Sequence, residues 1–314
     1  MTTDEELRTV AEAVESSLSV VGCGPGATAS LQQTVDGTRS ASTGSEGEAA
    51  DRQATLVAVD LGDAAFSAAR DGDGSPSGAG TETATGLEAT VQELDGFTIL
   101  VASVPAQFGV AERDALDRFR EVADAVVLVR DGWLGDAVRE LRALIEDAGV
   151  VNLDLADVRT LLAPGSLGVF TGGTGSTSAP ESAVTAAVDG LVSGVDPATG
   201  DGALIDVVGT ADLSVDGAAS LVDRVRAHVG EESHVIWGTD VADVAAETST
   251  PDRSGSGPAD VRLRLLVAGI DPPEPTRTPG DRCPRCDGTL SGYTMGDSTT
   301  IACDDCGYAG VSRR

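Results

Sequence analysis

Apolar positions along the chain alternate between short continuous runs and stretches with helical spacing. The runs at 54–60, 97–104 and 125–129 predict buried strands, because strands that are covered on both faces are apolar throughout. The stretches at 87–94 and 110–122 repeat apolar residues at helical spacing and predict amphipathic helices. This alternation predicts an α/β domain with a parallel sheet between two layers of helices.

The beginning of the chain and the end of this domain follow the same pattern. Apolar residues at helical spacing predict a lead-in helix within 1–17, and an apolar run at 18–21 predicts the first strand of a main domain spanning 18–150. A long central helix is predicted at 133–148, with its apolar residues on one side. Polar, Ser- and Gly-rich residues at 38–53 predict a loop or a disordered insertion.

The second half of the chain predicts a smaller α+β domain at 151–271. Its predicted elements are strands at 202–209, 234–238 and 261–268, and a helix at 215–229. Proline-rich residues at 272–280 predict a stiff, extended linker. The last residues, 281–314, form a short separate module.

Composition and charge restrict the class of protein. The 314 residues are 41% hydrophobic but only 3% aromatic, so the cores must consist mainly of Val, Leu and Ala. A net charge of −30 without any lysine indicates adaptation to a high-salt cytoplasm, where ions screen the repulsion between carboxylates. The same charge disfavours bulk binding to nucleic acid or anionic membrane. The sequence contains no signal peptide and no apolar run of 18 residues, which predicts a cytoplasmic protein without a membrane span.

Four of the five cysteines lie in the carboxy-terminal module. Cys283 and Cys286 form one CxxC pair, and Cys303 and Cys306 form a second pair after sixteen intervening residues. This spacing is typical of a zinc ribbon, in which four thiolates bind Zn²⁺ tetrahedrally. Disulfides are the alternative, and a cytoplasmic location disfavours them. Because so short a module has almost no core, the metal is expected to supply most of its folding free energy.

A glycine-rich turn follows the first predicted strand. Gly22, Gly24 and Gly26 lie between that strand and a polar helix, where backbone N–H groups and a helix N-terminus can bind phosphate. Many such turns only reverse the chain, and Pro25 removes one N–H donor. Since the chain has no lysine, a lysine-bearing P-loop is excluded, which leaves the glycine loops of dinucleotide-binding and tubulin-like folds.

Two carboxylates mark the segment after the central helix. Asp154 and Asp157 precede a predicted helix at 158–162, and a carboxylate at either position can cap such a helix. The whole string from Asn152 to the Gly-rich strand near Gly175 resembles the synergy loop of FtsZ, the bacterial and archaeal homologue of tubulin. In that family, the loop enters the nucleotide site of the next subunit, where its acidic residues polarise the water that attacks the γ-phosphate of GTP.

The resemblance to FtsZ covers roughly residues 18–271. It implies a Rossmann-like nucleotide-binding domain, a central helix and a smaller α+β domain, with a site for GTP or GDP and Mg²⁺. Arg113 matches a residue that contacts nucleotide, Trp133 one that stacks on guanine, and Asp136 one that bonds the guanine edge. The other positions that match the family's nucleotide loops are Gly22, Gly24, Gly26, Gly78, Gly80, Thr81, Thr83 and Asn152.

Several positions depart from the family's pattern. Asp60 stands where the family usually has Asn, Glu82 stands at a glycine position, and Gly109 replaces the acid that holds the ribose. A carboxylate that faces a triphosphate is electrostatically costly unless Mg²⁺ intervenes. The segment at 71–86 is therefore either a phosphate loop or a polar linker, and Trp133 is either a guanine-stacking residue or a core aromatic.

Two functions of different classes follow from these observations. The first is a cytoskeletal or division-related GTP-binding protein with weak or absent GTPase activity, in which Asp154 and Asp157 complete hydrolysis in trans. Its partners would be copies of itself in filaments, or an FtsZ-type protein. The second is a non-catalytic scaffold or regulator whose zinc ribbon contacts a protein or nucleic-acid partner. The intact acidic loop favours the first function, and the altered phosphate loops favour the second.

Overall fold

The structure is a computed structural model that describes residues 18–34, 39–40, 53–63, 84–146, 150–163, 165–230, 232–241, 260–295 and 298–312. The predicted lead-in helix lies outside the described residues. So do four of the predicted nucleotide-binding residues, Gly78, Gly80, Thr81 and Thr83.

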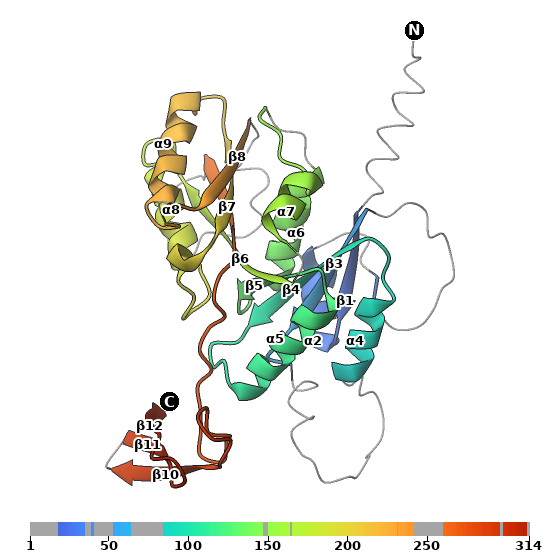
Figure 1. The fold of residues 1–314 in the computed structure, drawn as a ribbon. Coiled ribbons are helices and arrows are strands. Elements are labelled where there is room, and N and C mark those ends of the chain that lie inside the picture. Colours follow the sequence, from blue (N-terminus) through green and yellow to red (C-terminus); the bar gives the residue numbers. More distant parts are fainter. Residues whose placement is uncertain are drawn as a thin grey trace.

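A nine-stranded, mostly parallel sheet forms the centre of the protein (Figure 1). Its strands are β1 (Leu18–Cys23), β2 (Arg39–Ser40), β3 (Ala54–Asp60), β4 (Phe97–Val104), β5 (Ala125–Arg130), β6 (Ser166–Gly175), β7 (Gly202–Gly209), β8 (His234–Val241) and β9 (Val261–Ala268). Their spatial order is β2-β1-β3-β4-β5-β6-β9-β7-β8. Only β9 runs antiparallel to its neighbours, β6 and β7. Strand β6 pairs with β5 on one side and β9 on the other, so it links the two predicted domains.

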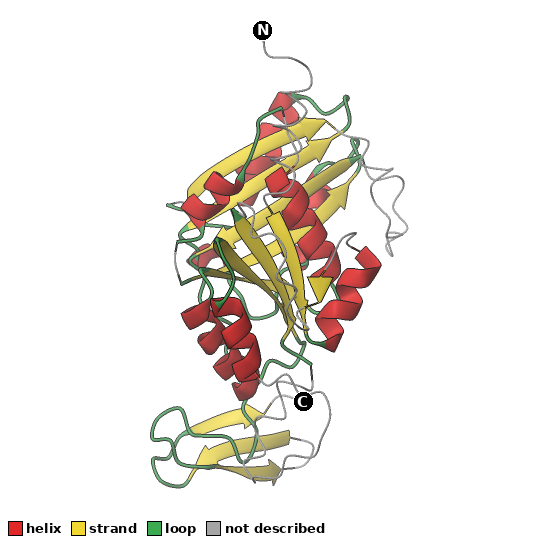
Figure 2. Ribbon diagram, turned by 90° about the vertical axis from the view of Figure 1, so that its right-hand side faces the viewer, coloured by secondary structure: helices red, strands yellow, loops and turns green. Residues whose placement is uncertain are grey.

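Helices cover both faces of this sheet, as the alternating pattern predicts (Figure 2). They are α2 (Pro25–Thr34), α4 (Ala84–Gln92), α5 (Val110–Val122), α6 (Leu134–Glu146), α7 (Leu155–Leu161), α8 (Glu181–Asp189) and α9 (Val215–Arg226). One apolar core lies under α4, α5, α8 and α9, and a second lies under α2, α6 and α7. The buried residues of these cores are mainly Val, Leu and Ala, as the shortage of aromatics predicts.

Helix α8 was not expected from the sequence, and its packing explains why. Its buried residues, Ala183, Val184 and Ala187, are small and few. A Cβ atom on Gly173 of β6 would lie 2.1 Å from the carbonyl oxygen of Ala183, so only glycine lets the helix approach this closely. The Gly-rich strand near Gly175 therefore serves to pack a helix against the sheet.

The carboxy-terminal module is a three-stranded antiparallel sheet with its own small core. Strands β10 (Leu290–Met295), β11 (Ser298–Cys303) and β12 (Ala309–Ser312) pair in sequence order. Its core contains Leu290 and Ile301 beside two of the cysteines. Both views show the module beyond one end of the body (Figures 1 and 2).

The predicted linker lies against the body before it reaches this module. Pro273 is buried, and the backbone N–H of Thr276 donates a hydrogen bond of 2.6 Å to the carbonyl oxygen of Phe108. Thr276 also forms a parallel β-bridge with Gly109. Tertiary contacts therefore anchor the linker at the end of the sheet where β4 terminates.

Candidate functional site

The predicted glycine loop lies at the carboxyl end of β1, where it turns into α2. Gly24 adopts a φ of +88°, a left-handed conformation that favours glycine. Helix α2 begins at Pro25, so Gly26 belongs to its first turn. A Cβ atom on Gly22 would lie 2.9 Å from Cδ1 of Leu31, which makes Gly22 a packing residue beneath the helix. Of the three glycines, Gly24 and Gly26 therefore border the outer surface of the loop.

Two carboxylates, one from the last residue of β3 and one from the loop that follows it, face this glycine turn. The backbone N–H of Gly26 donates a hydrogen bond of 3.1 Å to Oδ2 of Asp63. Oδ1 of Asp60 accepts a hydrogen bond of 3.0 Å from the N–H of Gly62. The sequence reading identified Asp60 but missed Asp63. The signal in the sequence that could have found Asp63 is a second acid, three residues after the one that ends a buried strand.

The environment of Asp60 raises the pKa of its carboxyl group. Burial is the largest cause, and the negative charges of Asp131 and Asp63 act in the same direction. The hydrogen bond from Gly62 opposes them without reversing the shift. The carboxyl ends of β3 and β5 thus gather negative charge beside the glycine turn that follows β1, where the FtsZ resemblance implies a phosphate-binding site.

Three of the predicted nucleotide-contacting residues have partners within the chain. Trp133 stacks on Phe170 of β6, with ring centroids 5.7 Å apart and planes inclined by 19°. Asp136 pairs with Arg139 one turn along α6, at 2.9 Å. Arg113 pairs with Asp117 on α5, at 3.0 Å. Trp133 therefore packs against the core, while the two charged residues belong to local ion pairs on helix surfaces.

Asp154 and Asp157 together form the cap at the start of α7. Oδ1 of Asp154 accepts hydrogen bonds from the N–H groups of Ala156, at 2.7 Å, and Asp157, at 3.1 Å. Oδ2 of Asp157 accepts one from the N–H of Asp154, also at 3.1 Å. This reciprocal arrangement is a capping box, and it starts the helix at Leu155, earlier than the predicted residue 158. The helix-capping role weighed from the sequence is thus present in the structure.

The acidic loop lies at the opposite end of the sheet from the glycine loop. Arg159 of α7 donates a hydrogen bond to the carbonyl oxygen of Gln53, and its guanidinium lies 5.2 Å from the centre of the Phe97 ring. Gln53 and Phe97 stand at the amino ends of β3 and β4, whereas Asp60 ends β3 and Asp63 follows it. The central helix α6 lies between these ends and spans about 20 Å. The acidic loop of one chain cannot reach the glycine loop of the same chain.

Exposed valines lie just before the acidic loop in the chain and on the adjacent strand β8. Val150, Val151 and Val241 are 69%, 44% and 54% exposed. The backbone of Val151 exchanges two hydrogen bonds with Thr239, of 3.0 and 3.2 Å, and so extends the edge of β8. Asn152 and Asp154 are exposed beside them. This end of the body therefore presents a valine patch, defined by these three residues, next to a capped acidic loop.

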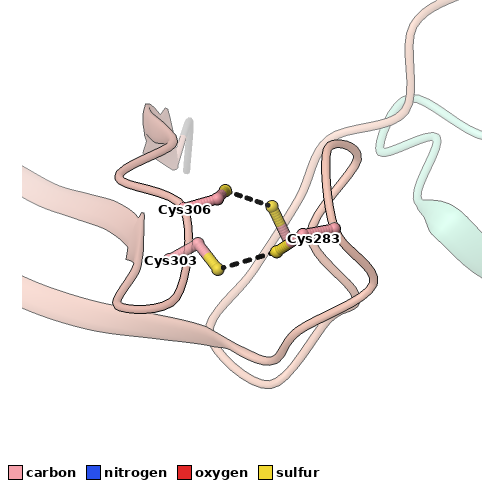
Figure 3. Close-up of side chains that lie close together, drawn as sticks. Cys283, Cys303 and Cys306 are labelled. Carbon is pink, nitrogen blue, oxygen red and sulfur yellow. Dashed lines mark hydrogen bonds between the residues drawn. The ribbon is translucent and has the colours of Figure 1, made fainter.

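The four cysteines of the carboxy-terminal module converge as the CxxC spacing predicts (Figure 3). Sγ of Cys283 lies 3.6 Å from Sγ of Cys306, and Sγ of Cys286 lies 3.5 Å from Sγ of Cys303. Disulfide bonds require about 2 Å, and all four thiols are free. Zn–S bonds of about 2.3 Å in a tetrahedron separate the sulfurs by about 3.8 Å, so the arrangement is compatible with a four-thiolate metal site.

Comparisons with known proteins agree with this architecture, although no family model matches the chain. The cell division protein FtsZ of Haloferax mediterranei is 27% identical over 223 residues, which cover 63% of this chain and 56% of that protein. The cell division protein FtsZ 1 of Archaeoglobus fulgidus is 28% identical over 225 residues, 63% of this chain and 57% of that protein. The chain thus spans about half the length of the curated relatives it matches.

Solved structures share this fold, and two of them show the extent of the likeness. An empty FtsZ dimer from M. jannaschii has a TM-score of 0.57 and 16% identity, and the match covers 85% of this chain and 93% of that one. The GDP-form protofilament of TubZ from Bacillus thuringiensis serovar israelensis has a TM-score of 0.55 and 13% identity, with 87% and 92% covered.

The mostly parallel sheet, the central helix and the smaller α+β region define the FtsZ/tubulin fold. With the sequence matches to archaeal FtsZ, they identify the chain as a divergent member of the FtsZ/tubulin superfamily with a four-cysteine module at its carboxyl end. The fold class expected from the sequence is confirmed. Within the described residues, no helix is long and apolar enough to cross a membrane.

Proposed function

We propose that this chain is a cytoskeletal, division-related protein that associates head to tail with another subunit of the FtsZ/tubulin type. The observation that carries the proposal is the position of its two candidate surfaces. The acidic loop with Asp154 and Asp157 and the glycine loop with Gly24 and Gly26 lie at opposite ends of α6. Such surfaces meet only between successive subunits. The partner is a second copy or an FtsZ-type protein, in the cytoplasm.

The surface around the acidic loop supports this mode of association. The valine patch has three exposed apolar side chains on a chain with a net charge of −30. Burial of apolar area favours association by about 25 cal/mol per Å², and in a halophilic cytoplasm salt screens the repulsion between acidic subunits. Relatives of this chain include proteins named for cell division, and TubZ is described as a protofilament.

We propose guanine nucleotide, GTP or GDP, as the ligand of the strand ends. Within one subunit, the residues that would hold it are Gly24, Gly26, Gly78, Gly80, Thr81, Thr83, Arg113, Trp133 and Asp136. Gly22 would support the glycine loop from beneath, and Asn152 would approach the nucleotide from the next subunit. Mg²⁺ would neutralise charge between the phosphates and the nearby carboxylates. In a head-to-tail pair, Asp154 and Asp157 of one subunit would orient the attacking water at the γ-phosphate held by the next, a task of position and charge.

Turnover measurements on mixed subunits test this function. Asn is as good a helix cap as Asp, so Asp154→Asn keeps α7 intact while removing the charge. GTP turnover per subunit should rise with the concentration of wild-type protein, and adding the variant should lower the wild-type rate. Asp196→Asn is the matched control, because Asp196 also caps a short helix through the N–H of Ala198. A rate that depends on neither concentration nor Asp154 would leave the loop as a helix cap alone.

A second candidate function is a non-catalytic scaffold or regulator whose zinc ribbon contacts a protein or nucleic-acid partner. The bond between Asp63 and Gly26 favours it, because it engages an amide that a phosphate would need. Zn²⁺ bound by Cys283, Cys286, Cys303 and Cys306 would hold the ribbon folded. Calorimetry with GTP and Mg²⁺ in high salt separates the two functions, since the absence of any binding heat would favour the scaffold.

A further inference from the structure

The first turn of α2 donates a hydrogen bond to a carboxylate of the same chain, that of Asp63. Pro25 has no N–H, so Gly26 carries the first backbone donor of this helix. That N–H donates to Oδ2 of Asp63, at 3.1 Å. A helix N-terminus attracts negative charge because its first N–H groups lack partners within the helix. The carboxylate of Asp63, 37 residues from Gly26 in the sequence, supplies the negative charge and accepts this hydrogen bond.

The space beside both outward glycines is also filled by carboxylate oxygens. A Cβ atom on Gly24 would lie 3.2 Å from Oδ2 of Asp63. A Cβ atom on Gly26 would lie 3.0 Å from Oδ2 of Asp60 and 3.5 Å from Oδ2 of Asp63. Glycines in a phosphate loop leave room for the backbone to approach phosphate oxygens. Here carboxylate oxygens occupy that room.

We propose that Asp63 is an intramolecular competitor of nucleotide phosphate, which closes the glycine loop until an incoming phosphate displaces it. The inference rests on the proposed nucleotide site at the strand ends and adds its regulation. A phosphate oxygen needs the Gly26 N–H that Asp63 holds, and it must also approach the charges of Asp60 and Asp63. Nucleotide affinity is therefore set by the ease with which the Asp63 carboxylate leaves the loop.

A single-atom change separates the charge of Asp63 from its hydrogen bond. Asp63→Asn retains an oxygen that can accept from Gly26 and removes the negative charge. Asp124→Asn is a matched control. Oδ2 of Asp124 also accepts one backbone hydrogen bond, of 2.7 Å from the N–H of Thr98, but at the amino end of β4, away from the glycine loop. Both variants change the net charge by the same amount. A difference between them therefore reports position and not overall charge.

Calorimetric titration of the full-length protein with GTP, in high salt with Mg²⁺, measures the effect. The Kd for GTP should fall at least about tenfold in Asp63→Asn, since like charges a few ångströms apart repel measurably. It should stay at the wild-type value in Asp124→Asn. The gain should shrink as salt is raised, because ions screen this repulsion. Thermal melting of each variant establishes that it is folded, and Asp63→Ser provides a shorter neutral acceptor if the Asn variant does not fold.

The possible outcomes separate this inference from the proposed function. Measurable and equal GTP affinity in the wild type and both neutral variants would overturn the role of Asp63 and leave the nucleotide site standing. Absence of GTP binding in every variant, including the neutral ones, would overturn both. Tighter GTP binding in Asp63→Asn alone would support both the nucleotide site and the competing role of Asp63.

Discussion

Nε of Arg264 on β9 lies 2.8 Å from Oε2 of Glu140 on the central helix α6. Nη1 of the same guanidinium lies 2.9 Å from Oδ2 of Asp206 on β7. Arg262 approaches Glu140 from the same strand, at 3.5 Å. These contacts connect the central helix to the strands of the smaller α+β region. The side chains that make them are largely buried.

Removing Glu140 should destabilise the protein strongly. Glu140→Ala leaves Arg264 and Arg262 buried without their shared carboxylate, a change that typically costs about 3–5 kcal/mol in the free energy of unfolding. Denaturant unfolding in high salt measures this loss. Glu146→Ala on the same helix is the control, because Glu146 pairs with a more exposed Arg142, and such pairs contribute at most about 1 kcal/mol. Equal effects of the two substitutions would contradict a structural role for the network.

The same network predicts a loss of stability in acid. Burial alone would raise the pKa of Glu140, but the positive charges of Arg264 and Arg262 outweigh it and lower that pKa. A lowered carboxyl pKa contributes stability above the unfolded-state value, near pH 4, and loses it as pH falls through the folded-state value. Part of the acid-induced loss should therefore be absent in Glu140→Gln. An unchanged pH dependence in that variant would exclude Glu140 as its source.

Asp60 should behave in the opposite way. Its pKa is raised, mainly by burial and then by Asp131 and Asp63, so its ionised form is disfavoured in the folded protein. The associated stability is present below about pH 4 and is lost as pH rises through the folded-state pKa. Asp60→Asn should therefore raise Tm at pH 7 relative to wild type, with a smaller gain near pH 4. A Tm gain of the same size at both pH values would contradict this linkage.

Metal removal should unfold the ribbon and spare the body. Cys303→Ser removes one of four thiolates from a module whose core contains only a few side chains. Elemental analysis should find one Zn²⁺ per wild-type chain and a large loss in the variant. The melting transition of the body should stay in place, since neither body core contains a ribbon residue. Cys23→Ser is the control and should retain zinc, because Cys23 lies at the end of β1, and zinc retention in Cys303→Ser would refute the assignment.

The anchored linker should become accessible when its hydrogen bond to the body is removed. Thr276→Pro deletes the N–H that donates to Phe108, whereas Thr276→Val keeps it. Trypsin cleavage after Arg277, which is half-buried, should be several-fold faster in the proline variant and unchanged in the valine variant. Mass spectrometry of timed digests identifies the cut. Equal rates in all three proteins would show that the bond does not hold the linker.

Local patterns in the sequence predict most elements of the fold. The bounds of β3, β4, β7, β9 and α5 agree with continuous apolar runs or helical spacing, because burial on both faces imposes these patterns directly. The sequence also predicts that the four cysteines form one site. CxxC pairs place two thiols in one turn, and only a shared ligand or a pair of disulfides accounts for two such turns in a short module.

The roles of individual site residues were harder to predict. The sequence predicts either a helix cap or a catalytic loop for Asp154 and Asp157, and the structure contains the cap. The sequence predicts either a guanine-stacking residue or a core aromatic at Trp133, and in the structure its ring stacks on Phe170. Both contacts depend on backbone geometry or on a strand far along the chain. The nucleotide roles proposed for these residues concern a ligand and a second subunit, which the pattern within one chain does not encode.

The sequence by itself determined most of the strands and helices along the chain, the acidic composition, the four-cysteine module and the likeness to FtsZ. Only the tertiary structure decided that Asp63 bonds Gly26, that Arg264 joins Glu140 to Asp206, and that Thr276 anchors the linker beside Gly109. Hydrophobic periodicity reports whether a residue faces the core, since burial acts on each element separately. Polar contacts between distant segments depend on how the strands are ordered in the sheet, and their partners, 37 and 124 residues apart in the first two cases, share no local pattern.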